Sequence, residues 1–195
     1  MDKLPTEVEI GGFKIEINKD FRQGIQFENM IKEYDLQDEK DAIKFYEEAI
    51  KLYYGNIPNE IKSEAVEKMM WFYRCGKDIN TEEVESTQKE KIIDYNYDAN
   101  KIYAAFRDQY RINFQKDKYM HWWEFKALIE GFKEDNEINK VMSIRATDIT
   151  QVPKEQKEYY TKLKRLAKIP LPTEEVEEDM EMSNILMNGG EIPKE

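Results

Sequence analysis

The chain has 195 residues, a formal net charge of −11 and 40% hydrophobic residues. This length fits one domain, and the apolar content is sufficient for a core. The negative charge argues against sequence-independent binding to nucleic acid, because the displacement of counterions from phosphates requires a cationic surface. The same charge disfavours anionic membrane surfaces, and no apolar run approaches the length of a membrane span.

Cysteine usage and the first residues indicate the compartment. Cys75 is the only cysteine, so no disulfide framework and no cysteine-based metal cluster is expected. The stretch Met1–Pro5 lacks the apolar segment of a signal peptide. We therefore expect a reducing cytoplasm.

The first predicted element is a β-hairpin over residues 7–18. Apolar and polar residues alternate on both sides of a Gly11-Gly12 pair, which suits a tight two-residue turn. The expected cross-strand pairs are Ile10 with Phe13 and Val8 with Ile15. All four side chains should share the face that packs on helices.

Three helices are predicted next. Asp20 and Asp38 are good N-cap residues, Pro58-Asn59 marks a third start, and Gly55 and Gly76 are typical stops. The expected inward residues are Phe21, Ile25, Phe27, Met30, Ile31 and Tyr34 in the first, Ala42, Phe45, Ala49, Leu52 and Tyr53 in the second, and Ile61, Ala65, Val66, Met69, Met70 and Tyr73 in the third.

The rest of the chain is also predicted to be helical up to Pro172. Residues 77–91 lack apolar periodicity, which indicates a loop or a weak exposed helix. Further helices are expected over 98–110, 119–132, 137–145 and 154–168. The predicted fold is mainly α, with a single helical domain over residues 1–172 that begins with the hairpin. A disordered acidic tail should follow over residues 173–195.

Charge is unevenly distributed near the C-terminus. Residues 173–195 hold eight acidic residues and one lysine, a net charge of −7, whereas residues 154–168 hold six basic and two acidic residues, a net charge of +4. We expect the acidic tail to fold back on the basic helix.

No catalytic, metal-binding or cofactor-binding residues are predicted. His121 is the only histidine, which excludes histidine triads and multi-histidine metal sites, and a packed side chain is favoured over a general base. Cys75 follows Arg74, so its pKa could be lowered, but a buried structural thiol is favoured. Asp94–Asn100 resembles the start of a calcium loop, yet it has Ala99 where the turn needs glycine, and capping by Asp98 explains it better.

Apolar clusters give the candidate partner-binding residues. Aromatic side chains crowd two helices and cannot all face one helical stripe, which leaves two readings open: core, or a groove for a partner helix. Ile185-Leu186-Met187 is an apolar island in the acidic tail, either a motif that orders on binding or a solvated segment. The candidates are Trp71, Phe72, Trp122, Trp123, Ile185, Leu186 and Met187.

The block from His121 to Leu128, HWWEFKAL, resembles the signature of the bacteriophage gene-product-fifteen family of long-tailed phages and prophages of Gram-positive bacteria. The similarity covers about Leu4 to Leu171. Family members favour glycine where this chain has Arg111, and aspartate where it has Asn113. Other blocks that agree in order are Phe72–Lys77, Asp94-Tyr95, Asp98-Ala99, Ile102–Phe106, Tyr110–Ile112, Met142–Arg145 and Asp148.

This resemblance implies a non-enzymatic tail-assembly chaperone. Its expected partners are the tape-measure protein, a companion tail-assembly chaperone and copies of itself. It should act in the host bacterial cytoplasm and be absent from the mature virion. The alternatives are a structural tail or connector protein retained in the virion and, less well supported because of the single histidine, a hydrolase or metal-dependent enzyme.

Overall fold

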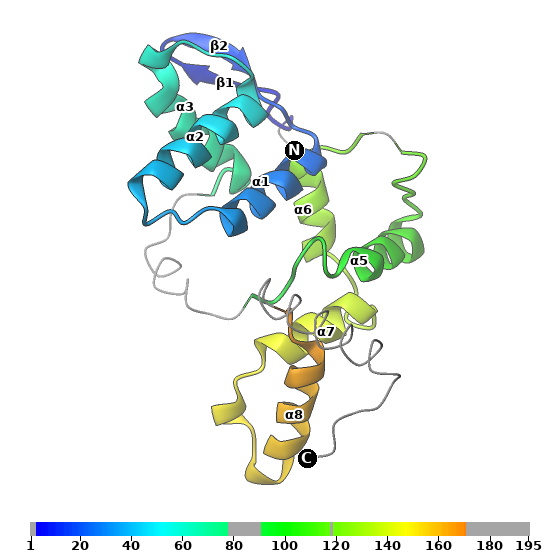
Figure 1. Cartoon of the computed structure of the whole chain (residues 1–195). Coiled ribbons are helices and arrows are strands. Elements are labelled where there is room, and N and C mark those ends of the chain that lie inside the picture. Colours follow the sequence, from blue (N-terminus) through cyan, green and yellow to red (C-terminus); the bar gives the residue numbers. More distant parts are fainter. Residues whose placement is uncertain (1–2, 78–90, 118, 171–195) are drawn as a thin grey trace, which may run out of the picture.

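The computed structural model describes residues 3–77, 91–117 and 119–170 (Figure 1). The elements in chain order are β1 (Glu7–Ile10), β2 (Phe13–Glu16), α1 (Phe21–Glu33), α2 (Glu39–Tyr54), the 3-10 helix η1 (Asn59–Ile61), α3 (Lys62–Tyr73), α5 (Ala99–Ala105), the π-helix η3 (Phe106–Tyr110), α6 (Trp122–Glu130), α7 (Glu137–Ala146), the 3-10 helix η4 (Ile149–Gln151) and α8 (Lys154–Ala167). The mainly α fold with an N-terminal hairpin is confirmed. The predicted tail and nearly all of the predicted 77–91 loop lie outside the described residues, and the boundary at residue 172 stays a prediction.

The hairpin, α2 and α3 form one end of the molecule, and α7 and α8 form the other (Figure 1). Between these ends lie α1, α5 and α6. Within the described ranges, no helix has both the length and the apolar character needed to cross a bilayer.

The hairpin has the predicted register, with Ile10 opposite Phe13 and Val8 opposite Ile15. Gly11 and Gly12 form the turn with φ values of 59° and 76°, which glycine adopts without steric cost. The expectation that all four apolar side chains pack on helices is wrong for Phe13, which is 72% exposed. The reason is that β1 packs against α3, whereas β2 has few contacts with any helix.

Aspartate side chains start α1 and α2 as predicted. Asp20 accepts a hydrogen bond from the backbone N–H of Arg22, and Asp38 accepts bonds from those of Lys40 and Asp41. Each bond satisfies an N–H group that has no partner within the first turn of its helix. At the other end of α2, Gly55 stops the helix with a φ of 71°.

The second half of the chain departs from the expected boundaries in two places. The helix predicted over 98–110 is divided, because α5 passes into the π-helix η3, whose C-cap residue is Arg111. Arg111 has a φ of 61°, the left-handed conformation that glycine adopts most easily, so a glycine at this position would fit the turn without steric cost. The tryptophan helix begins at Trp122 and not near Tyr119, because the residues before it pair with the start of α1.

That pairing fixes α6 against α1. The backbone N–H of Phe21 donates to the carbonyl oxygen of Met120 at 3.0 Å, and the N–H of Trp122 donates to that of Lys19 at 2.7 Å. Two helix starts are thereby joined side by side, although about a hundred residues separate them in the sequence.

Trp122 lies at the centre of the core and is 1% exposed. Its indole stacks on the ring of Tyr73, with centroids 5.6 Å apart and an interplanar angle of 11°. The same indole also packs on Gly24 of α1, where an added Cβ would stand 2.2 Å from the indole Cε3. Only a residue without a side chain therefore lets α1 and α6 approach this closely.

A buried ion pair attaches α7 to α5. Arg145 is 4% exposed and donates to both carboxylate oxygens of Asp98, at 2.6 and 3.0 Å. The same guanidinium donates to the carbonyl oxygens of Ile92 and Ala167. Asp98 also accepts the backbone N–H of Asp94. The expectation that Asp98 caps a helix is therefore wrong: it occupies the N-cap position but makes no capping bond, because its oxygens are used by Arg145 and Asp94.

The replacement Gly24→Ala tests the contact with Trp122. Helix propensity alone would raise the free energy of unfolding by about 1 kcal/mol. The overlap with the indole should instead lower it by about 1–3 kcal/mol. Chemical denaturation gives the sign, and the loss should shrink in a Trp122→Phe background because the two changes share one contact. A stabilised Gly24→Ala protein would contradict the packing described.

The replacement Arg145→Met tests the ion pair. It leaves the Asp98 carboxylate buried without a cation, so the free energy of unfolding should fall by about 3–5 kcal/mol. Lys140→Met is the matched control, because Lys140 pairs with Glu137 at 3.8 Å on the surface of the same helix. The control should change stability by less than about 1 kcal/mol. Equal losses in urea denaturation would refute a special role for the buried pair.

Candidate partner-binding surfaces

The two indoles of α6 are joined to the end of α3 by hydrogen bonds. Nε1 of Trp122 donates to the carbonyl oxygen of Tyr73 at 2.8 Å, and Nε1 of Trp123 donates to that of Phe72 at 2.7 Å. Carbonyls in the last turn of a helix lack partners within the helix. The tryptophan pair therefore completes the end of α3 and fixes α6 to it.

Trp71 lines a hollow on the surface beside this cluster. Its ring packs edge to face on Trp123, with centroids 5.4 Å apart, and both side chains are partly exposed. The hollow has a volume of about 440 Å³ and lies between β1 and α3. Its lining includes Val8, Glu9, Lys68, Trp71 and Arg74.

The predicted partner-binding residues therefore fall into three groups. Phe72 is fully buried and Trp122 is 1% exposed, so both belong to the core and offer no surface to a partner in this fold. Trp71 and Trp123 are adjacent and partly exposed. Ile185, Leu186 and Met187 lie outside the described residues.

Another candidate surface, between α2 and α3, was not identified from the sequence. Helices α2 and α3 leave an apolar groove of about 410 Å³ between them, at the end of the molecule that carries the hairpin. Ile43 is 55% exposed and Tyr46 is 40% exposed in this groove, and Ile50 and Val66 form its floor. Ile43 is an apolar residue outside the stripe that was expected to face inward. This position was the available sign in the sequence that α2 carries an exposed apolar surface.

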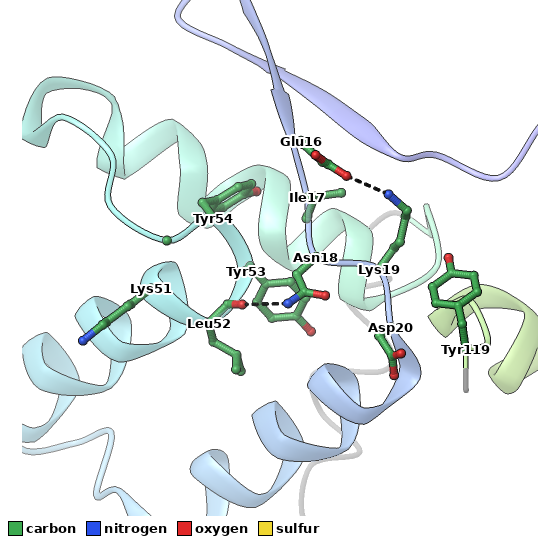
Figure 2. Close-up of a pocket in the computed structure, with 11 residues that line it drawn as sticks. Glu16, Ile17, Asn18, Lys19, Asp20, Lys51, Leu52, Tyr53, Tyr54 and Tyr119 are labelled. Atoms are coloured by element: carbon green, nitrogen blue, oxygen red, sulfur yellow. Dashed lines mark hydrogen bonds and ion pairs between the residues drawn. The ribbon is translucent and has the colours of Figure 1, made fainter. Parts of the chain in front are cut away.

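Figure 2 shows another hollow, of about 610 Å³, where the link between β2 and α1 passes the end of α2. Its wall carries two carboxylates, Glu16 and Asp20, and two ammonium groups, Lys19 and Lys51. Lys19 pairs with Glu16 at 2.9 Å (Figure 2). The opposite charges balance, so this wall gives no preference for a ligand of either sign.

His121 caps α6. The backbone N–H of Trp123 donates to Nδ1 of His121 at 3.0 Å, so Nε2 carries the proton and donates to the carbonyl oxygen of Pro5 at 2.8 Å. The ring is 3% exposed and both nitrogens are used in the fold. This geometry is that of the packed side chain favoured by the sequence, not of a general base.

Two other chemical candidates are also structural. Burial raises the pKa of the half-buried Cys75 thiol to about 11, the opposite of the lowered pKa that a reactive cysteine requires. Asp94 accepts bonds from Lys32 and from the backbone of Asn96 and Tyr97. In the part of the chain that the structure describes, no group of three or more histidine, cysteine or carboxylate side chains could hold a metal ion.

The pH dependence of stability tests the role of His121. Its ring must be neutral, because Nδ1 accepts while Nε2 donates. Burial lowers the pKa of His121 below its ordinary 6.5, so the unfolded chain binds the proton more readily. The contribution of His121 to the free energy of unfolding should therefore be fully present above about pH 6.5. It should decline as the pH falls below this value.

Denaturation between about pH 5 and 8 measures this decline. The variant His121→Asn keeps a side-chain acceptor at the N-cap but does not titrate there, so its stability should vary less across the same range. The interpretation fails if both proteins lose stability in parallel.

The comparison with known proteins agrees with the blocks quoted above. The family model described as Bacteriophage Gp15 protein matches residues 1–169. No curated protein and no solved structure matches the chain. The family match includes every described helix and the three residues Trp71, Trp122 and Trp123. The chain therefore belongs to the bacteriophage Gp15 family, a family of phage structural or morphogenesis proteins.

Proposed function

We propose that the protein is a non-enzymatic tail-assembly chaperone that binds the tape-measure protein during tail morphogenesis. It acts in the host bacterial cytoplasm and is absent from the mature virion. Its membership, over residues 1–169, of a family of phage structural or morphogenesis proteins carries this proposal. A companion chaperone and copies of the chain itself are further partners under the proposal.

The groove between α2 and α3 supports this function. An amphipathic helix can lay its apolar face between two packed helices. Ile43 and Tyr46 are the exposed apolar side chains at this groove, while Lys62 and Glu47, 3.9 Å apart, supply polar groups at its rim. A long helical client such as the tape-measure protein has the shape that such a groove accepts.

A structural tail or connector protein retained in the virion is the second candidate. The two-stranded sheet leaves the outer edges of β1 and β2 without a neighbouring strand among the described residues, and an open edge can pair with another subunit. Mass spectrometry of purified particles separates the two functions. The chaperone should be missing, whereas a structural subunit should be present in stoichiometric amount.

Co-expression with the tape-measure protein of the same phage tests the chaperone function and its site. The unmodified chain should keep the tape-measure protein soluble and co-purify with it. Ile43→Glu places a charge in the apolar groove and should weaken binding at least about tenfold, or ~1.4 kcal/mol. Phe13→Glu is the matched control, because Phe13 is an exposed apolar residue outside the groove, and it should bind like the unmodified chain.

The outcomes are distinguishable. If the unmodified chain leaves the tape-measure protein as insoluble as expression alone, the proposed function is refuted. If solubility is maintained and Ile43→Glu binds normally, the function stands and the groove is not the site.

A further inference from the structure

Helix α8 has one face that no described element covers. It packs against α7 and η4 at the end of the molecule farthest from the hairpin (Figure 1), and Tyr160, Leu163 and Ala167 are partly buried on that side. On the opposite side, Tyr159 is 62% exposed and Leu166 is 68% exposed. These two residues are seven apart, so they lie on one stripe of the helix.

Two cations accompany this exposed apolar pair. Lys162 lies between Tyr159 and Leu166 along the helix, and Arg165 immediately precedes Leu166. Both cations are exposed, and among the described residues neither side chain joins an ion pair. Their acidic neighbours Glu155 and Glu158 lie towards the start of α8, so the C-terminal half of this face is cationic and apolar.

The chain itself provides a segment of complementary chemistry. Residues 177–187 read EEDMEMSNILM, with four acidic residues interleaved with and followed by methionine, isoleucine and leucine. Acidic groups suit Lys162 and Arg165, and the apolar ones suit Tyr159 and Leu166. The chain leaves α8 at Ala167, so this segment begins ten residues beyond the surface that it complements.

Geometry permits the contact. The 14 residues of α8 span about 21 Å, because a helix rises ~1.5 Å per residue. The described chain ends at Pro170, and the seven residues from there to Glu177 can extend to about 23 Å. The acidic segment can therefore turn back alongside the C-terminal half of the helix.

We propose that residues 177–187 dock in cis on the outer face of α8, over Tyr159, Lys162, Arg165 and Leu166. A tether this short holds the segment at a local concentration in the millimolar range, which populates a contact too weak to form between separate molecules. The docked segment covers the cationic and apolar face until a competing partner displaces it. This inference concerns a surface separate from the α2–α3 groove, and its test needs no client protein.

A spin label on Ser183→Cys in the full-length chain tests the contact by NMR. At about 0.01 M salt, amide signals of α8 from Tyr159 to Leu166 should broaden relative to the same chain with the label reduced. The broadening should be lost near 1 M salt, where the screening length falls to ~3 Å. The unsubstituted chain, treated with the same reagent, gives the contribution of Cys75.

A charge exchange identifies the residues that make the contact. Lys162→Glu with Arg165→Glu should abolish the broadening, and adding Glu177→Lys with Glu178→Lys should restore it. Lys116→Glu with Lys133→Glu reverses two exposed lysines that do not belong to α8 and should leave the broadening unchanged.

Four results would overturn the proposal. These are no broadening on α8, broadening that survives the α8 reversal, no restoration by the exchange, or broadening that disappears on dilution and so reports contact between copies. Broadening at the α2–α3 groove alone would place the segment elsewhere and has the same consequence.

Discussion

The hydrogen bonds from Trp122 and Trp123 to the end of α3 are the interaction on which the arrangement of the body depends. Through them, a helix from the second half of the chain is fixed to the first half. The indole of Trp122 contacts both the ring of Tyr73 and the backbone of Gly24. This one side chain therefore donates a hydrogen bond to α3, stacks on Tyr73 and packs closely on α1. Close-packed interiors transmit such constraints, which is why α1, α3 and α6 hold one mutual arrangement.

The remaining helices are attached by a different kind of bond. Arg145 connects α7 to Asp98 at the start of α5 and to the end of α8, and both Arg145 and Asp98 are almost entirely buried. The aromatic packing lies at the centre of the molecule, and the buried charge pair joins α7 and α8 to it. Among the described residues, the exposed side chains of the α2–α3 groove and of the outer face of α8 belong to neither. These two surfaces are where the proposed function and the further inference place another segment of chain, and the family itself is one of phage structural or morphogenesis proteins.

Local signals in the sequence predicted most elements, whereas contacts between distant residues could not be predicted. Asp20 and Asp38 marked helix starts because capping involves the next few residues only. Asp98 looked like a third cap, but its partner Arg145 is 47 residues away. The adjacent indoles indicated a central helix, yet spacing could not show that Trp122 is buried while Trp123 remains partly exposed, because that depends on where α1 and α3 lie.

All three tryptophans of the chain belong to one cluster, since Trp71 packs on Trp123 and Trp122 follows on the same helix as Trp123. The tryptophan fluorescence of the protein therefore comes from a single place, where α6 packs against the end of α3. Tryptophan emission will accordingly follow the separation of α6 from the end of α3 during unfolding. Trp71 lies one turn beyond Glu67, which lines both the α2–α3 groove and the hollow beside Trp71, so a chain bound in that groove would lie close to this cluster.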